Sequence, residues 1–410
     1  MIGPPAILSP NSFAGALDQW PFKIVALSAS LPATAATNTR TWNYVEPQPP
    51  RNYVYQYNLN IQRQITSNIT VLLGYVGSRG LHNPFQADSS NTILPTKSPA
   101  GFYYWPINFT GNLSAGAQQS LLLNPTTAGI PTTMWQSSSW YNGLTLKVDK
   151  RMSHGVQVQG SFTWSKSIDT SSGSAAGDTF AFDYTSLPWY DLSLDKGLSD
   201  FNVGRNLVIN GLWNAPTPTF AGSFGERVLG GWQLGIITEL SDGVPTFPSI
   251  TSDMEGEDIA TVDPPNLVAG CSAQNLVNPD YRHSLLYVNA KCLSLVPMTA
   301  ANASVCDQRL GAGTCSNIRG NLGRNTLVGP GLFNIDFSVF KNNYVRKISE
   351  SFNVQFRAEF FNVLNHANFA PSGNLAAFTA LGAAPPNPFG LLTNTQGQNR
   401  IIQLALKLVW

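Results

Sequence analysis

The sequence predicts an all-β protein made of about ten long amphipathic strands, and three observations support this prediction. Apolar and polar side chains alternate at a period of two in nine separate segments. The 35 Gly, 28 Pro, 10 Trp, 13 Tyr and 22 Phe favour turns and strands over helices. Only 11% of the 410 residues are charged, against roughly 25% in an ordinary soluble domain. Uncharged polar and aromatic side chains must therefore cover the surface.

The first clear strand spans residues 53–62, where tyrosine, leucine and isoleucine alternate with glutamine and asparagine. A turn at 66–68 leads into a second strand over 69–75. Further strands with the same alternation are predicted over 144–149, 156–165, 207–214, 232–240, 333–340, 352–360 and 402–410, and a weaker tenth near 22–30. We expect each to be about 9 to 12 residues long, which matches a tilted strand that crosses a membrane better than a strand of a soluble sandwich.

The predicted connections alternate strictly between short or moderate and long. The former lie at 66–68, 153–155, about 216–229 and about 342–350, and the latter at about 78–140, 167–204, 242–332 and 364–399. Short turns on one side and long loops on the other are typical of an antiparallel transmembrane β-barrel, with short periplasmic turns and long extracellular loops. We expect residues 1–50 to form an N-terminal segment with a first strand and loop, and residues 51–410 to form the barrel portion.

The two faces of each predicted strand differ in the way that a lipid-facing barrel requires. One face is apolar, and the other carries mostly uncharged Asn, Gln, Ser and Thr, which suit a wet lumen. Aromatic residues lie near the strand ends, where an aromatic girdle would contact the membrane interface: Tyr53, Trp164, Trp213, Trp232 and Trp410. For each of them taken alone, packing in a protein core is the alternative.

Charge and the N-terminus limit the function. The net charge of +1 gives no broad positive field, so we expect no nucleic-acid partner. The chain starts Met1-Ile2-Gly3-Pro4-Pro5, without the basic segment and apolar core of an export signal. We therefore expect that the protein stays inside the cell or that the sequence begins partway through a longer gene product.

All four cysteines lie in the long loop 242–332. They are Cys271, Cys292, Cys306 and Cys315, and their spacing matches no zinc-binding pattern. An even number in a loop rich in Gly, Asn and Pro favours two disulfides of undetermined connectivity and an oxidising compartment. Four free thiols in a cytosolic loop are the alternative.

The sequence contains no motif typical of enzyme chemistry, so we expect no catalytic residue, metal site or cofactor. None of His82, His154, His283 and His366 has metal-ligand spacing. The acidic run Asp253, Glu255, Glu257 and Asp258 does not fit an EF-hand, and a solvated loop is its simpler interpretation. The aromatic segment 101–105 either contacts a ligand or folds back onto the barrel rim.

Several stretches resemble the C-terminal barrel of TonB-dependent outer-membrane receptors, in particular the Oar-like group with a carboxypeptidase-regulatory-like domain. They are residues 56–64, 74–80, 141–151, 162–167, 230–233 and, most specifically, 357–369. The terminal residues Leu406, Leu408 and Trp410 resemble the C-terminal signal that the barrel-assembly machinery reads. The resemblance covers the chain from about residue 45.

The resemblance implies a cell outer-membrane receptor that binds an unknown ligand and transports it. It implies outer-membrane lipid, the barrel-assembly machinery and the TonB complex as partners, with TonB contacted through a plug portion that this chain lacks. Such receptors have 22 strands, so about ten strands imply the C-terminal part of one. Ten strands either close a narrow barrel or remain a curved sheet with two open edges.

Two other functions remain open. A passive porin-like or adhesin-type barrel would be complete at this length. A secreted all-β binding module would be soluble without detergent.

Overall fold

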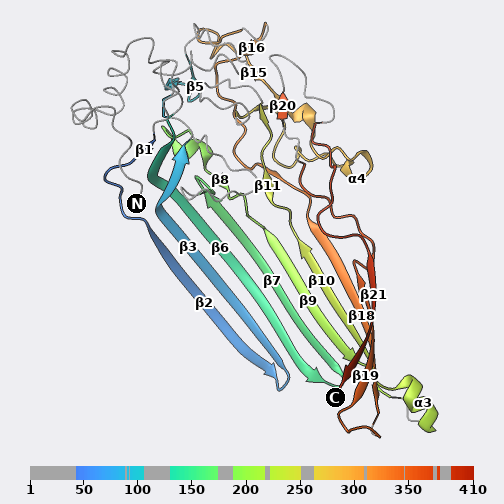
Figure 1. Ribbon diagram of the computed structural model, residues 1–410. Helices are drawn as coiled ribbons and strands as arrows, with labels where there is room; N and C mark the ends of the chain where they lie inside the picture. The colour runs from blue at the N-terminus through green and yellow to red at the C-terminus, as the bar shows by residue number, and fades with distance from the viewer. Residues whose placement is uncertain are drawn as a thin grey trace, which may run out of the picture.

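One large curved sheet dominates the computed structural model (Figure 1). The structure describes residues 43–87, 90–91, 93–105, 130–173, 188–217, 222–250, 263–308, 312–345, 347–372, 376–378 and 389–410. The tenth strand predicted near residues 22–30 lies outside the described residues. Among the described residues, no helix is both long and apolar enough to cross a membrane.

The sheet has the order β2-β3-β6-β7-β9-β10-β18-β19-β21, and all of these neighbours pair antiparallel. These nine strands correspond one to one with the nine that the alternation predicts. Their bounds are β2 (Tyr53–Thr66), β3 (Ile69–Ala87), β6 (Thr132–Ser153), β7 (Val156–Asp169), β9 (Arg205–Asn214), β10 (Trp232–Ser241), β18 (Leu332–Tyr344), β19 (Asn353–Phe361) and β21 (Ile401–Val409). The predicted antiparallel sheet is confirmed.

Short elements complete the described part of the chain. Two short strands extend the large sheet, β1 (Tyr44–Val45) beside β6 and β8 (Gly197–Leu198) beside β7. The other short strands are β4 (Thr96–Lys97), β5 (Tyr103–Tyr104), β11 (Pro245–Thr246), β12 (Ser249–Ile250), β13 (Asn266–Leu267), β14 (Leu293–Ser294), β15 (Val296–Pro297), β16 (Thr314–Cys315), β17 (Leu327–Val328) and β20 (Ala376–Phe378). The helices are α3 (Gly222–Leu229), α4 (Tyr281–Ser284) and the 3-10 turns η4 (Leu192–Asp195) and η6 (Ala290–Cys292).

Five of the nine strands are longer than the predicted 9 to 12 residues, and two of them are much longer. β3 has 19 residues and β6 has 22, so the link predicted at 78–140 is shortened to 88–131. Beyond Gly80 backbone pairing continues, with register shifts, up to Ala87 opposite Thr132. Phe85, Ala87 and Met134 in this part of the ladder form a small buried cluster. The register shifts interrupt the alternation on which the prediction rests, so the upper ends of both strands are missed.

The turn between β6 and β7 has the geometry that its sequence predicts. Ser153 pairs with Val156, which leaves His154 and Gly155 as a two-residue loop. Both have positive φ, 51° and 74°, as a type I′ hairpin turn requires. A Cβ on Gly155 would lie 2.7 Å from the carbonyl oxygen of Asn214, so glycine is needed here for space as well as for conformation.

One face of the sheet is apolar and exposed, and we call it the outer face. A continuous row of apolar side chains crosses seven strands of it in register: Ile61, Leu73, Leu146, Phe162, Leu207, Leu240 and Phe333. Leu59 and Leu406, in other rows of this face, are 64% and 68% exposed. Exposed apolar rows of this size mark contact with lipid or with another protein rather than with water.

The buried apolar core lies among the loops instead. Its main cluster includes the fully buried Leu276 and Leu327 together with Phe247, Phe389 and Leu392. These residues come from the loops at the end of the sheet opposite the C-terminus, where Figure 1 shows the long connections gathered. The strands thus expose apolar side chains, while the loops bury theirs in a core. This distribution is expected when lipid surrounds the strands and water surrounds the loops.

Candidate functional site

The loops at this end of the sheet pack into one assembly, which we call the cap. It comprises the described residues of 90–105, 188–204, 242–250, 263–308, 312–331, 362–372 and 389–400. Its largest cluster joins Phe247 and Leu276 to Leu327 and Phe389, from widely separated loops. The cap stands over the sheet's upper rim in Figure 1, so it lies where a ligand arriving from the loop side first meets the protein.

A buried cluster of charges joins the cap to the end of β7. The Arg324 guanidinium forms an ion pair with Asp169 and lies 3.3 Å from Asp200 Oδ1, and all three side chains are no more than 3% exposed. Arg324 Nε also donates to the Asp195 carbonyl oxygen at 2.9 Å, and Arg319 forms a third ion pair of the cluster, with the Asp195 carboxylate at 3.3 Å. Five charged side chains from three segments therefore form one largely buried network.

The cluster contains three carboxylates but two guanidinium groups. Burial raises the pKa of the Asp200 carboxyl to about 6, although Arg324 and the Asn325 side chain act in the opposite direction. Burial also raises the pKa of Asp195. Burial, together with the excess of carboxylates over guanidinium groups, therefore favours binding of a proton by the cluster.

Two disulfides lie in the cap. Cys271 is joined to Cys292, beside the main apolar cluster, and Cys306 is joined to Cys315. The sequence left the connectivity open, and in this structure the first cysteine along the chain bonds the second and the third bonds the fourth. The two bridges close separate loops, with sequence separations of 21 and 9 residues, so each constrains its own part of the cap.

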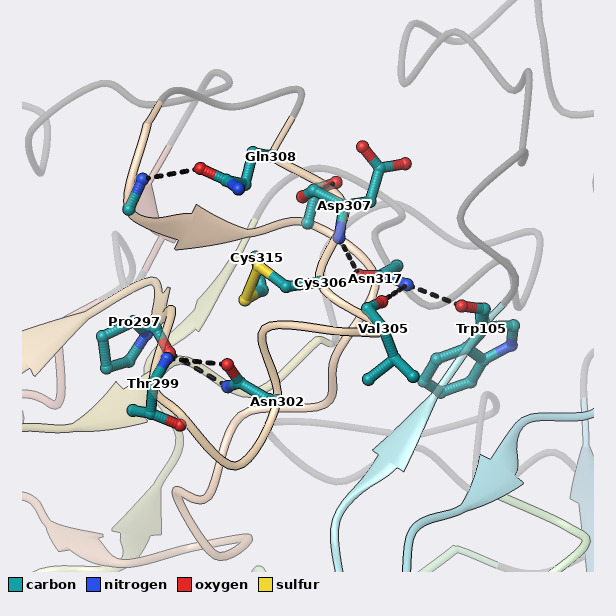
Figure 2. Close-up of a disulfide and its surroundings, with 12 residues drawn as sticks. Trp105, Pro297, Thr299, Asn302, Val305, Cys306, Asp307, Gln308, Cys315 and Asn317 are labelled. Carbon is teal, nitrogen blue, oxygen red and sulfur yellow. Dashed lines mark hydrogen bonds between the residues drawn. A yellow bond between two sulfur atoms is a disulfide. The ribbon is translucent and has the colours of Figure 1, made fainter.

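The aromatic segment 101–105 packs against the loop that the Cys306–Cys315 bridge closes (Figure 2). Trp105 is 1% exposed, its backbone N–H donates to the Asn317 carbonyl oxygen at 2.9 Å, and Asn317 Nδ2 donates back to the Trp105 carbonyl oxygen at 2.6 Å. Asn317 also donates to the Val305 carbonyl oxygen and accepts from the backbone N–H of Asp307. The segment therefore folds back onto the cap, and whether it also contacts a ligand stays a prediction.

The segment 362–368 fastens the upper ends of three strands. Asn362 accepts a hydrogen bond from the backbone N–H of His366 and donates to the carbonyl oxygens of His366 and Gln398. Asn368 accepts from and donates to the backbone of Phe333 at the start of β18. His366 itself lies in this network, with Nδ1 3.2 Å from Asn368 Oδ1, as expected of a structural loop residue.

The inner face of the sheet below the cap is polar. At β18 and β19, Asn342 Oδ1 accepts hydrogen bonds from Asn353 and Gln355 at 2.9 and 2.8 Å. Arg357 Nε donates to Gln355 Oε1 at 2.6 Å, and Lys147 pairs with Asp149 on β6 at 3.6 Å. These side chains alternate with the apolar outer rows, so they face the lumen if the sheet curves into a barrel.

The remaining predicted residues are placed as follows. Leu406 and Leu408 lie on β21 opposite Phe356 and Val354, and Trp410 follows the strand with 82% of its surface exposed. His154 is exposed in its turn. His283 contacts Asp280 at 2.8 Å, and the rings of His82 and Tyr53 lie 5.9 Å apart. The acidic run 253–258 lies outside the described residues. In the part of the chain that the structure describes, no group of three His, Cys, Asp or Glu is placed to hold a metal ion.

The sequence did not single out Arg324, Asp169 or Asp200. Their separation along the chain, 155 residues between Arg324 and Asp169, hides the cluster from any local pattern. The sequence offers only a weak signal for this cluster. Asp169 and Asp200 are charged residues at or beyond strand ends in a protein that has few charges.

A family model described as an outer membrane beta barrel domain matches residues 5–403. The outer membrane transporter YddB from Escherichia coli matches with 10% identity, a TM-score of 0.40 and coverage of 90% of this chain and 34% of that one. BauA, the ferric preacinetobactin receptor from Acinetobacter baumannii, matches with 11% identity, a TM-score of 0.36 and coverage of 87% and 29%.

The copper transporter OprC also matches, with 6% identity, a TM-score of 0.31 and coverage of 85% and 31%. This chain spans about a third of the length of each of these solved structures. No curated protein sequence matches the chain.

Proposed function

The chain belongs to the outer membrane beta barrel domain family, and from this premise we propose that it is the C-terminal barrel part of a TonB-dependent receptor of the Oar-like group. Its location is the outer membrane. The proposed activity is to bind a ligand on the cap side and to pass it along the polar inner face. The proposal includes no covalent chemistry, no metal and no cofactor.

The observation that carries the proposal is the open curvature of the sheet. Within the described residues β2 and β21 are the two ends of the strand order, and each has a single strand partner. A lipid-embedded sheet cannot leave a row of backbone N–H and C=O groups unpaired, because each costs several kcal/mol in hydrocarbon. Pairing of these edges with further strands would satisfy them, and this supports a part of a larger barrel over a complete narrow one.

The cap supports the ligand-binding half of the proposal. It is a packed assembly with two disulfides and a buried charge cluster, so its surface is held in a defined shape. Binding surfaces are commonly built from loops that a rigid scaffold positions. The ligand itself is not identified by fold-level likeness.

The proposed partners follow from the same assignment. Outer-membrane lipid contacts the outer rows, and the barrel-assembly machinery reads the end of the chain at Leu406, Leu408 and Trp410. The TonB complex acts through a plug portion that is not part of this chain.

Two measurements test the proposal. The DNA upstream of the Met1 codon should continue in frame into a plug-encoding segment, and the whole product should cross-link to TonB in energised cells. The chain alone, reconstituted in planar lipid bilayers, should give no uniform conductance step, because its sheet is incomplete. A uniform and stable step from the chain alone would favour the passive porin instead. Release from membranes without detergent would favour the secreted module.

A further inference from the structure

Two cationic side chains lie over one tryptophan ring on the outer face, at the cap end of the sheet, and a third lies nearby on the next strand. Arg79 on β3 lies directly opposite Trp140 on β6, with its guanidinium carbon 5.8 Å from the centroid of the Trp140 ring. Lys196, between η4 and β8, places Nζ 4.5 Å from the same centroid. Lys166 on β7 lies opposite Asn142, two residues from Trp140, and thus within reach on the same face. We call Arg79, Trp140, Lys166 and Lys196 the Trp140 patch.

The patch lies where the apolar rows of the outer face end. On β7 the outward residues run from Phe162 through Trp164 to Lys166, and all three are exposed. Just before the patch, the hydroxyl groups of Tyr57 and Tyr75 donate to Asn142 Oδ1 at 3.1 and 2.7 Å. The surface therefore changes from apolar side chains to tyrosine and tryptophan and then to charged side chains. A barrel surface shows the same order where it passes from the acyl chains to the lipid headgroups.

Among the described residues, no carboxylate pairs with the three cations of the patch. None of them takes part in an ion pair between the residues that the structure describes. Arg205, the next outward cation on β9, differs because both of its guanidinium nitrogens Nε and Nη2 donate to Asp242 at 2.9 Å. Two cations drawn to one ring repel each other, and the face of a single indole offsets only part of that repulsion. An anion placed between the two cations would offset the remaining repulsion.

We propose that the Trp140 patch binds the phosphate groups of an outer-leaflet lipid headgroup. Arg79 offers a planar fork suited to phosphate, and Lys166 and Lys196 add point charges. The occupant is a lipid because the apolar rows containing Leu144 and Trp164 continue directly below the patch and provide a surface for acyl chains. This site lies on the opposite face from the transport path, so it does not depend on the proposed function.

The test compares lipids that differ only in phosphate. The protein purified from outer membranes is placed in phosphatidylcholine nanodiscs that contain lipid A or dephosphorylated lipid A, and bound lipid is counted by native mass spectrometry. Lipid A should bind in preference to its dephosphorylated form. The triple variant Arg79→Gln, Lys166→Gln and Lys196→Gln should lose about fivefold in affinity for each charge, or roughly a hundredfold in all.

A matched control removes the same number of charges from the inner face: Lys147→Gln, Arg357→Gln and Lys407→Gln should leave lipid A binding unchanged. If the triple patch variant does not assemble, the pair Lys166→Gln and Lys196→Gln carries the test, with about a 25-fold loss expected. Equal binding of both lipids, or equal losses in patch and control variants, would overturn the proposal. Displacement of lipid A by millimolar inorganic phosphate would show a site for free anions and would overturn the lipid assignment.

Discussion

Arg324 is the residue on which the attachment of the cap to the sheet most depends. It pairs with Asp169 and Asp200 and donates to the backbone of Asp195 and Asp169. A buried ion pair adds little net stability compared with an apolar replacement of both partners. Removal of one partner, however, leaves the other charges buried without a counter-ion. Arg324 therefore acts mainly by holding the cap in place, and its removal should destabilise the junction between the cap and β7.

We predict that Arg324→Met destabilises the docked cap by about 3–5 kcal/mol, because it leaves buried carboxylates without their counter-ion. Hydrogen exchange of residues 316–328 and of 197–204 measures this. Arg205→Met, which breaks the exposed pair with Asp242, is the matched control and should cost no more than about 1 kcal/mol. Equal protection in both variants would contradict this role.

The same cluster predicts a pH dependence. Because burial raises the pKa of Asp200 from 3.8 to about 6, the docked cap holds a proton that the undocked loop releases. The associated stability is fully present below about pH 4 and is lost as the pH rises through about 6, with a total of up to about 3 kcal/mol. Hydrogen exchange of the cap should therefore be slower at pH 5 than at pH 7.5, after correction for intrinsic rates. Asp200→Asn should weaken this dependence of cap stability on pH. An unchanged dependence in that variant would mean that another group causes it.

At the scale of elements, each disulfide acts on a different part of the cap. The Cys306–Cys315 bridge holds the loop that presents Asn317 to Trp105, while the Cys271–Cys292 bridge lies beside the main apolar cluster. The segment containing β5 therefore depends on a loop more than 200 residues away. A sequence pattern cannot show this docking, because it joins two aperiodic loops.

We predict that Cys306→Ser with Cys315→Ser loosens the docking of residues 101–105. The closed loop is short, so the expected cost is about 2–3 kcal/mol, and it should appear as faster hydrogen exchange in the peptide containing Trp105. Cys271→Ser with Cys292→Ser is the matched control and should leave that peptide protected. Loss of protection in both variants alike would mean that the cap opens as a single unit.

The elements also show what the sequence can and cannot predict. Alternation identified all nine long strands, because each must keep one side apolar, and His154-Gly155 identified its turn. It underestimated β3 and β6, because register shifts interrupt the alternation in their upper parts. It could not find the Arg324 cluster or the docking of Trp105, since both join residues that are remote in the chain and that carry no periodic signal.

For the whole molecule, the distribution of apolar residues decides its surroundings. The sheet exposes apolar rows on its outer face, while the buried core lies in the cap. This arrangement is stable only if lipid covers the rows and water covers the loops. It also gives the low charge content of the sequence a cause, because charged side chains on a lipid-facing row cost about 2–4 kcal/mol at mid-depth.

The assignment of faces is tested most directly at two adjacent positions on β6. Leu146 points to the outer face and Lys147 to the inner face. Single variants Leu146→Cys and Lys147→Cys are labelled in intact outer-membrane vesicles with a membrane-impermeant maleimide, and a fluorophore at each site is then exposed to brominated lipids. Cysteine at 146 should resist the maleimide and be quenched by the lipid, and cysteine at 147 should behave in the opposite way. Equal aqueous labelling at both positions, without quenching at 146, would contradict a lipid-facing sheet.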